Sequence, residues 1–215
     1  MRINCLSETA VTITLGELIS PEMHREVMRF CAFLRDAAAN EAVELVPGYA
    51  SVTVFVSIDF YSRHGSLKEY FSGICAQYGQ EHRRDVRETG RKVEIPVNYT
   101  GEDLEEVAAY CGLKVEEVIQ IHSRTEYVVA MMGFRPGFPY LLGLDSRLTV
   151  PRRSSPRLRV PKGSVAIGGQ QTGIYPGESP GGWHIIGYTS EVLFEVNRTP
   201  PNLLETGDVV RFRPV

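Results

Sequence analysis

Residues 133–187 restrict the fold more than any other part of the chain, because glycine and proline are concentrated there. This segment holds eleven of the twenty glycines and seven of the thirteen prolines. Proline fixes φ at about −65°, whereas glycine adopts positive φ or lets another group approach closely. Short strands joined by shaped turns are therefore expected, and loops with such a fixed backbone commonly line a binding site.

The sequence after Thr125 has no helical periodicity. Strands are expected in TEYVVAMMGF, RLTVP, SVAIGG, HIIGYTS, VLFEV and DVVRFRP. Short strands separated by Gly/Pro turns predict a β-barrel or a sandwich. Two helices are expected before them, in EDLEEVAAYCGL and KVEEVIQIHS, because acidic residues favour a helix N-terminus.

The first eighty residues alternate strands with helices. Residues 2–15 are expected to form strands with a turn near Ser7, and two strand-forming runs meet at Pro47-Gly48. Helices are predicted after two N-cap residues, Ser20, which precedes Pro21, and Ser66. The resulting β-α-β-β-α order predicts a ferredoxin-like domain without its last strand. Residues 91–99 supply that strand or form an edge shared with the next domain.

The tract QEHRRDVRETGRK, residues 80–92, is dense in charge and almost free of apolar side chains, as a connection between domains would be. We therefore place a boundary near Gly90. The sequence predicts an α+β protein, with a small ferredoxin-like α/β domain over 1–90 and a β domain over 91–215.

Composition narrows the classes of partner. A net charge of −3 argues against general nucleic-acid binding, and no apolar run is long enough for a signal peptide or a membrane span. The four cysteines, Cys5, Cys31, Cys75 and Cys111, form no CxxC pair and are expected to be reduced and mostly buried. These features predict a cytoplasmic protein that binds neither nucleic acid nor membrane, with no metal ligand set in its sequence pattern.

Positive charge is concentrated between Gly133 and Gly173. Seven basic residues face one acid, Asp145; they are Arg135, Arg147, Arg152, Arg153, Arg157, Arg159 and Lys162. Because guanidinium groups suit carboxylate and phosphate, the tract predicts an anionic ligand or an acidic partner. The alternative is that these arginines pair with acids elsewhere in the fold.

The loop IYPGESPGGWHIIG, residues 174–187, contains the only tryptophan and a histidine. His184 is a candidate general acid or base, since imidazole titrates near neutral pH; His122 is a weaker candidate that helix capping alone explains. Trp183 either anchors a partner or fills the barrel core. GGQQTG, residues 168–173, lacks the Lys-Ser/Thr ending of a P-loop, although Gln170 and Gln171 could hydrogen-bond an amide or lactam. No self-contained active site is visible.

Residues 133–190, from GFRPGFPYLLGLDSRL to GGWHIIGYTS, closely resemble the KipI / allophanate hydrolase subunit 1 family, as do DLEEVAAYCGL, VEEVIQIHS and the ending PPNLLETGDVVRFRPV. The resemblance implies a cyclophilin-like β-barrel after the α/β domain. It carries over Arg152, Arg153, Arg157 and Tyr175, which with Gln170 and Gln171 are the expected substrate or anion site. Trp183, Pro180 and Phe138 are the expected partner interface.

The same resemblance implies a non-autonomous member of an ATP-dependent complex that opens 5-oxoproline, a small carboxylate. Its expected partners are a C-type protein, similar to allophanate hydrolase subunit 2, and an A-type lactam-utilisation protein. ATP would be used by the complex, at a site shared with or carried by a partner. Two other roles stay open: inhibition of a sensor histidine kinase, and a part in a urea- or allophanate-handling assembly.

Overall fold

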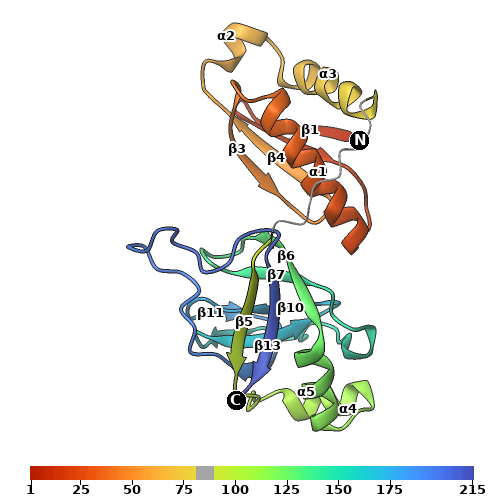
Figure 1. Cartoon of the computed structure of the whole chain (residues 1–215), viewed down its shortest axis with the longest axis vertical. Helices are drawn as coiled ribbons and strands as arrows, with labels where there is room; N and C mark the ends of the chain where they lie inside the picture. Colours follow the sequence, from red (N-terminus) through yellow and green to blue (C-terminus); the bar gives the residue numbers. More distant parts are fainter. Residues whose placement is uncertain (81–89) are drawn as a thin grey trace. The chain divides into compact units, whose positions relative to one another are not determined.

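The computed structural model describes residues 1–80 and 90–215, which form two compact units, Met1–Glu88 and Thr89–Val215 (Figure 1). Most of the charged tract at 80–92, expected to connect two domains, lies outside the described residues. None of the helices formed by the described residues combines the length and apolar character needed to cross a membrane.

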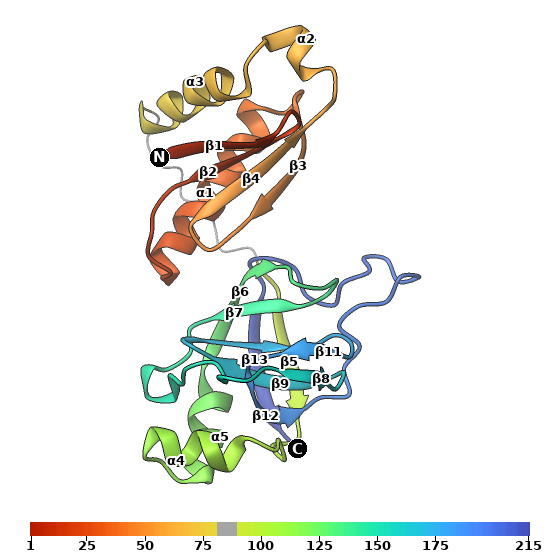
Figure 2. The same cartoon turned by 180° about the vertical axis from the view of Figure 1, so that it is seen from behind.

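The first unit is a four-stranded antiparallel sheet covered by helices on one face (Figure 2). Its strands are β1 (Arg2–Ser7), β2 (Ala10–Thr14), β3 (Ala42–Pro47) and β4 (Ser51–Val56), in the order β1-β2-β4-β3. Its helices are α1 (Pro21–Ala37), α2 (Phe60–His64) and α3 (Leu67–Gln80). Ser20 caps α1 as predicted, because its hydroxyl accepts a hydrogen bond from Met23 N at 3.1 Å.

The ferredoxin-like description of this unit is not confirmed. The strand expected at 91–99 is β5 (Lys92–Val97), and it joins the sheet of the second unit. There it pairs in parallel with β13 (Val209–Pro214), from Lys92↔Val209 to Val97↔Pro214. The free edge beside β2 is instead occupied by β1, a pairing between neighbouring strands.

The second unit is a nearly closed barrel of seven strands in the order β12-β9-β10-β7-β6-β13-β5. The additional strands are β6 (Glu126–Met132), β7 (Pro139–Leu142), β9 (Ser164–Gly168), β10 (Gln171–Ile174) and β12 (His184–Tyr188). Two hydrogen bonds between Asn98 and Tyr188 join the end of β5 to β12 and close the sheet. The predicted α+β class with a C-terminal barrel is therefore confirmed.

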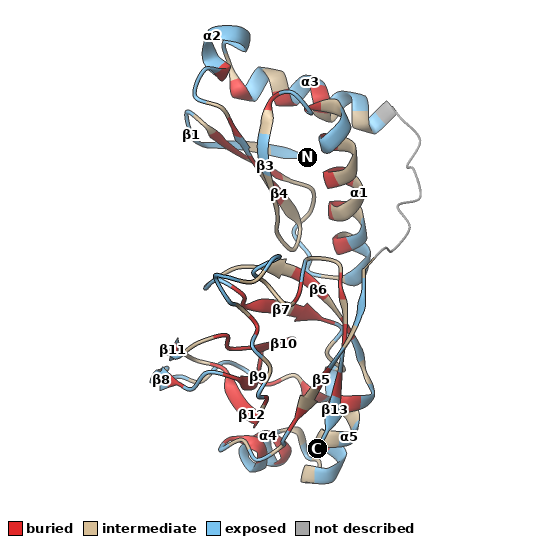
Figure 3. Cartoon of the chain, turned by 60° about the vertical axis from the view of Figure 1, so that its left-hand side comes forward, coloured by how far each residue is buried: buried red, intermediate tan, exposed pale blue. Residues whose placement is uncertain are grey.

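Two helices, α4 (Leu104–Cys111) and α5 (Val115–Arg124), pack near one end of the barrel, and a ribbon of β8 (Arg157–Val160) and β11 (Ser179–Gly181) lies beside it (Figure 1). Figure 3 shows that the barrel strands carry most of the buried residues of this unit. His122 of α5 is fully buried among them. Tyr99 donates to its Nδ1 at 2.7 Å, and its Nε2 contacts Thr172 Oγ1 at 3.0 Å.

Two expected strands do not form. RLTVP begins within the 3-10 helix η1 (Ser146–Leu148), and Val150 makes only an isolated bridge before Pro151, which has no N–H to donate. VLFEV forms only an isolated antiparallel bridge, between Phe194 and Asn202, and Arg198 donates to the carbonyls of Val192 and Leu193. The four cysteines are free as expected, but only Cys31 is fully buried.

Candidate functional site

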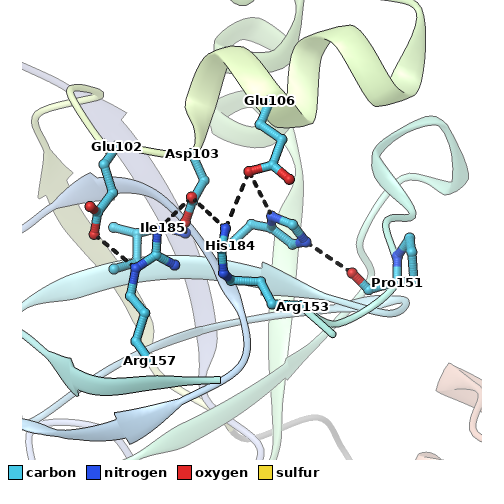
Figure 4. Close-up of polar contacts among 8 residues, drawn as sticks. All are labelled: Glu102, Asp103, Glu106, Pro151, Arg153, Arg157, His184 and Ile185. Carbon is cyan, nitrogen blue, oxygen red and sulfur yellow. Dashed lines mark hydrogen bonds and ion pairs between the residues drawn. The ribbon is translucent and has the colours of Figure 1, made fainter. Parts of the chain in front are cut away.

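Asp103 is the centre of a polar cluster where α4 meets β12 (Figure 4). Its backbone N–H donates to the Ile185 carbonyl at 2.9 Å, and its Oδ2 accepts the Ile185 N–H at 2.7 Å. The carboxylate is buried and makes no capping hydrogen bond to its own helix. Because burying an unpaired carboxylate is costly, the surrounding cations are part of its structural role.

Two of the predicted anion-binding arginines meet this carboxylate. Arg153 Nη1 lies 3.0 Å and Arg157 Nη2 lies 2.6 Å from Asp103 Oδ1. Arg153 also contacts Glu106 Oε2 at 3.2 Å, and Arg157 Nε contacts Glu102 Oε1 at 3.2 Å. Hydrogen bonding to Asp103 raises the pKa of Arg157. The pairing of tract arginines with acids elsewhere, left open by the sequence, therefore holds at both positions.

His184 lies beside the cluster with a defined tautomer. Its Nε2 is 3.0 Å from the Pro151 carbonyl oxygen, which can only accept, so Nε2 carries the proton. In the neutral ring Nδ1 is then an unprotonated base. It is enclosed, makes no hydrogen bond, and faces Glu106 Oε2 at 3.9 Å. A gap of that length suits a bridging water or a substrate atom.

Three polar atoms of this cluster lack a hydrogen-bond partner, namely His184 Nδ1, Arg153 Nε and Arg157 Nη1. Buried polar atoms are rarely unsatisfied in folded proteins, and they concentrate where water, an ion or a ligand binds. Glu106 is largely exposed and Arg153 is partly exposed, so solvent reaches the edge of the cluster.

Asp103, Glu106 and His184 also form a constellation that sequence spacing could not reveal, since their candidate ligand atoms lie within 4.8 Å of one another. The arrangement does not favour a cation. Both Asp103 oxygens are already engaged by guanidinium groups and by the Ile185 N–H. Two positive charges at hydrogen-bond distance would also repel a metal ion.

The three residues expected at the partner interface are divided between core and surface. Trp183 and Phe138 are buried in an aromatic cluster with Tyr175, whereas Pro180 is exposed on β11. A Cβ at Gly168 would lie 2.5 Å from Trp183 Cδ1, which explains the glycine there. The isolated chain thus packs Trp183 as a core residue. Arg152 lies over the Trp183 ring, with its guanidinium carbon Cζ 5.8 Å from the ring centre.

The remaining predicted ligand-binding residues lie in strands and turns. GGQQTG is the tight turn between β9 and β10, with Gln170 exposed at its tip and Gln171 buried in β10. No helix follows this turn, so it does not form the phosphate cradle of a P-loop. Tyr175 is buried against Phe138, and burial raises the pKa of its hydroxyl.

The structure describes an α+β chain whose barrel carries a buried ion network beside one histidine. The sequence of this chain matches the carboxyltransferase domain, subdomain C and D, over residues 1–204, and the chain belongs to this family. It is 41% identical to the B subunit of 5-oxoprolinase from Bacillus subtilis, over 98% of this chain and 91% of that protein. It is 42% identical to the protein of the same name from Haemophilus influenzae, over 99% of this chain and 97% of that protein. The resemblance inferred from the sequence is confirmed.

Solved structures agree with this assignment. The chain superposes on TTHA0988 with a TM-score of 0.80 at 35% identity, covering 96% of this chain and 40% of that one, so it spans less than half of the solved protein. The uncharacterized protein PH0987 from Pyrococcus horikoshii is 39% identical over 100% of this chain and 97% of its own, with a TM-score of 0.58. The K. lactis urea amidolyase, at 18% identity and a TM-score of 0.76 over 96% of this chain and 14% of that one, shares the fold.

Proposed function

We propose that the chain is the B-type subunit of an ATP-dependent 5-oxoprolinase and helps to hydrolyse 5-oxoproline to glutamate. The observation that carries this proposal is the near full-length identity, 41% or 42%, to proteins named as the B subunit of 5-oxoprolinase. Because such a complex uses ATP, we place it in the cytoplasm. Of the other two roles, the urea- or allophanate-handling one has weaker support, because similarity to a putative urea carboxylase of Emericella nidulans covers only 43% of this chain at 29% identity.

The chemistry is divided between different chains in this proposal. Among the described residues the ion cluster contains a candidate base but no serine or cysteine nucleophile in contact with it, and the glycine-rich turn is not a phosphate cradle. ATP is therefore assigned to a partner or to a site completed by one. The partners are the C-type and A-type proteins implied by the family.

Within the complex, His184 is the proton-transfer group. Its Nδ1 accepts a proton from the attacking water or returns one to the leaving ring nitrogen, while the Pro151 carbonyl holds the ring by its Nε2. Hydrolysis breaks the lactam C–N bond and adds the elements of water across it. Glu106, at 3.9 Å, stabilises the imidazolium that forms in between.

Arg153 and Arg157 are assigned to the carboxylate of 5-oxoproline, with Arg152 and Gln170 as exposed contributors. Gln171 and Tyr175 are buried, so we assign them an indirect part in the site rather than contact with the substrate. Arg153 and Arg157 each use one nitrogen to contact Asp103, and their unpartnered atoms, Arg153 Nε and Arg157 Nη1, are the donors assigned to a carboxylate. Pro180, backed by Trp183 and Phe138, is assigned to the partner interface.

Reconstitution tests this function. The purified chain alone should not turn over 5-oxoproline with ATP, and glutamate should form only after the C-type and A-type proteins are added. His184→Gln in the reconstituted complex should lower kcat. Turnover by the chain alone, or a complex that is equally active without it, would contradict the proposal.

A further inference from the structure

The ion cluster around Asp103 contains more negative than positive charge. Three carboxylates face two guanidinium groups in it (Figure 4); they belong to Glu102, Asp103, Glu106, Arg153 and Arg157. With a neutral His184, the cluster therefore carries one net negative charge. A ligand that brings only a carboxylate would add a second negative charge, which repulsion between like charges disfavours.

Two acceptor atoms face each other at the edge of this cluster. His184 Nδ1 is an acceptor in the neutral ring, because the proton lies on Nε2, 3.0 Å from the Pro151 carbonyl oxygen. Nδ1 makes no hydrogen bond and lies 3.9 Å from Glu106 Oε2. The His184 side chain is only 6% exposed, so this acceptor is enclosed. Because buried polar atoms are normally paired, the two acceptors indicate a ligand group that donates at least two hydrogen bonds.

Donors suited to a carboxylate lie beside the two acceptors. Arg153 Nη1 contacts the same Glu106 oxygen at 3.2 Å, and the Nε of that guanidinium is enclosed and unpartnered. Acceptors next to a guanidinium match a ligand whose nitrogen and carboxylate are attached to the same carbon. The side chains of Glu106 and Arg153 are 59% and 28% exposed, so the cluster borders solvent here and a ligand approaches on this side.

We propose that Glu106, His184 and Arg153 bind the α-amino and α-carboxylate groups of an amino acid, so that the isolated chain binds glutamate more tightly than 5-oxoproline. The inference rests on the proposed function, in which these compounds are product and substrate. The α-ammonium contacts Glu106 and His184, its adjacent carboxylate faces Arg153, and Asp103 keeps its own contacts.

Ring opening explains the preference for the product. Hydrolysis breaks the lactam C–N bond, and the attacking water supplies the oxygen of the new carboxylate. Both hydrogens of that water end on the nitrogen, which changes from an amide with one N–H to an ammonium with three. The ammonium can donate to both acceptors, and its positive charge offsets the net negative charge of the cluster, whereas the lactam N–H can donate only one strong hydrogen bond.

Calorimetric titration of the isolated chain with four compounds tests this site. L-glutamate should bind with a Kd at least about tenfold lower than that of 5-oxoproline. L-norvaline has the same α-amino and α-carboxylate groups without the second carboxylate, and it should bind at least as well as glutamate. Glutarate lacks the amine and should bind as weakly as 5-oxoproline.

Glu106→Gln removes the charge that faces the ammonium and keeps a carbonyl oxygen. Its Kd for glutamate should rise about tenfold, whereas its Kd for glutarate should not rise. Glu105→Gln is the matched control, because Glu105 is also exposed in the first turn of α4 but lies outside the cluster. It should bind glutamate as the unmodified chain does, and the Tm of each variant shows that both are folded.

The outcomes separate this site from the function on which it rests. The site is overturned if the unmodified chain binds none of the four compounds, or binds 5-oxoproline as tightly as glutamate. Equal effects of Glu106→Gln and Glu105→Gln on the glutamate Kd would also overturn it. Turnover of 5-oxoproline by the reconstituted complex tests the function independently. A chain that binds glutamate as expected but contributes nothing to that turnover would overturn the function alone.

Discussion

Asp103 Oδ1 and Arg157 Nη2 lie 2.6 Å apart and join the start of α4 to β8. The carboxylate is almost completely buried and also accepts from Arg153 and the Ile185 N–H. It therefore links three segments of the barrel unit that are far apart in sequence.

Asp103→Asn should destabilise the barrel unit strongly. The amide removes the negative charge and leaves two guanidinium groups beside a neutral residue, and breaking one side of a buried ion pair costs about 3–5 kcal/mol. The partial exposure of both arginines places the expected loss at the lower end, about 3 kcal/mol. Urea unfolding followed by the fluorescence of Trp183, the single tryptophan, reports on this unit alone.

The control for this variant is Glu126→Gln, which breaks the exposed pair between Lys92 and Glu126. Exposed pairs contribute about 0–1 kcal/mol, so its unfolding midpoint should hardly move. Equal midpoints for the two variants would mean that the Asp103 network does not hold the segments together.

Arg153→Ala and Arg157→Ala should each lower the activity of the reconstituted complex more than Arg29→Ala, which removes a charge from α1. Loss of one charge-assisted hydrogen bond to substrate corresponds to about 1.5–3 kcal/mol, or about tenfold or more in kcat/KM. Because both substitutions also leave Asp103 less well paired, activity is compared below the Tm of every variant and at saturating partner. Similar activity in all three would count against an anion site.

Local signals in the sequence predicted most of the elements. The Ser20 cap, the break at Pro47-Gly48 and the acidic start of α4 each depend on residues a few positions apart. The strands β7, β8, β10 and β11 were not predicted, because runs of three or four residues are too short for a local pattern to identify. Their pairing comes from tertiary contacts, which override local propensity.

The site was predicted only in part for the same reason. The basic tract and His184 stood out as local features, whereas Glu102 and Glu106 were indistinguishable from ordinary acids at a helix start. Their role depends on β12 bringing Ile185 to Asp103 across 82 positions of sequence. The strand at 92–97 pairs with β13 in the barrel. Because β13 is distant in the chain, local sequence could not show to which sheet this strand belongs.

The stability of the barrel unit should fall as the pH falls below 6.5, partly because of His122. Its ordinary pKa is 6.5, and complete burial lowers it to about 3 in the folded chain. Between these pH values the unfolded state binds a proton that the folded state does not. The contribution of the neutral His122 ring to folding stability is therefore fully present above pH 6.5 and is lost as the pH falls towards 3. At about pH 5 the loss should be on the order of 2 kcal/mol.

Carboxylates contribute acid sensitivity of the same sign, so the decisive comparison is with His122→Gln. This variant should be less stable at about pH 7, where it loses the Tyr99 and Thr172 contacts, but its stability should depend less on pH down to about pH 5. Parallel pH curves for the two proteins would show that His122 does not titrate between the folded and unfolded states.

Trp183→Ala distinguishes the two roles that the sequence left open for this residue. The ring is 5% exposed and packs against Phe138 and Tyr140 at 5.7 and 5.9 Å. Emptying that space should cost about 3–5 kcal/mol of folding stability and lower the Tm of the isolated chain.

Gly168→Ala provides the complementary test. Its new Cβ would press on the ring at 2.5 Å, and overpacking should cost about 1–3 kcal/mol. Calorimetric unfolding and binding to the C-type protein are measured on both variants. An unchanged Tm with weakened binding would make Trp183 an interface anchor. A large fall in the Tm of both variants would make Trp183 a residue of the barrel unit's core.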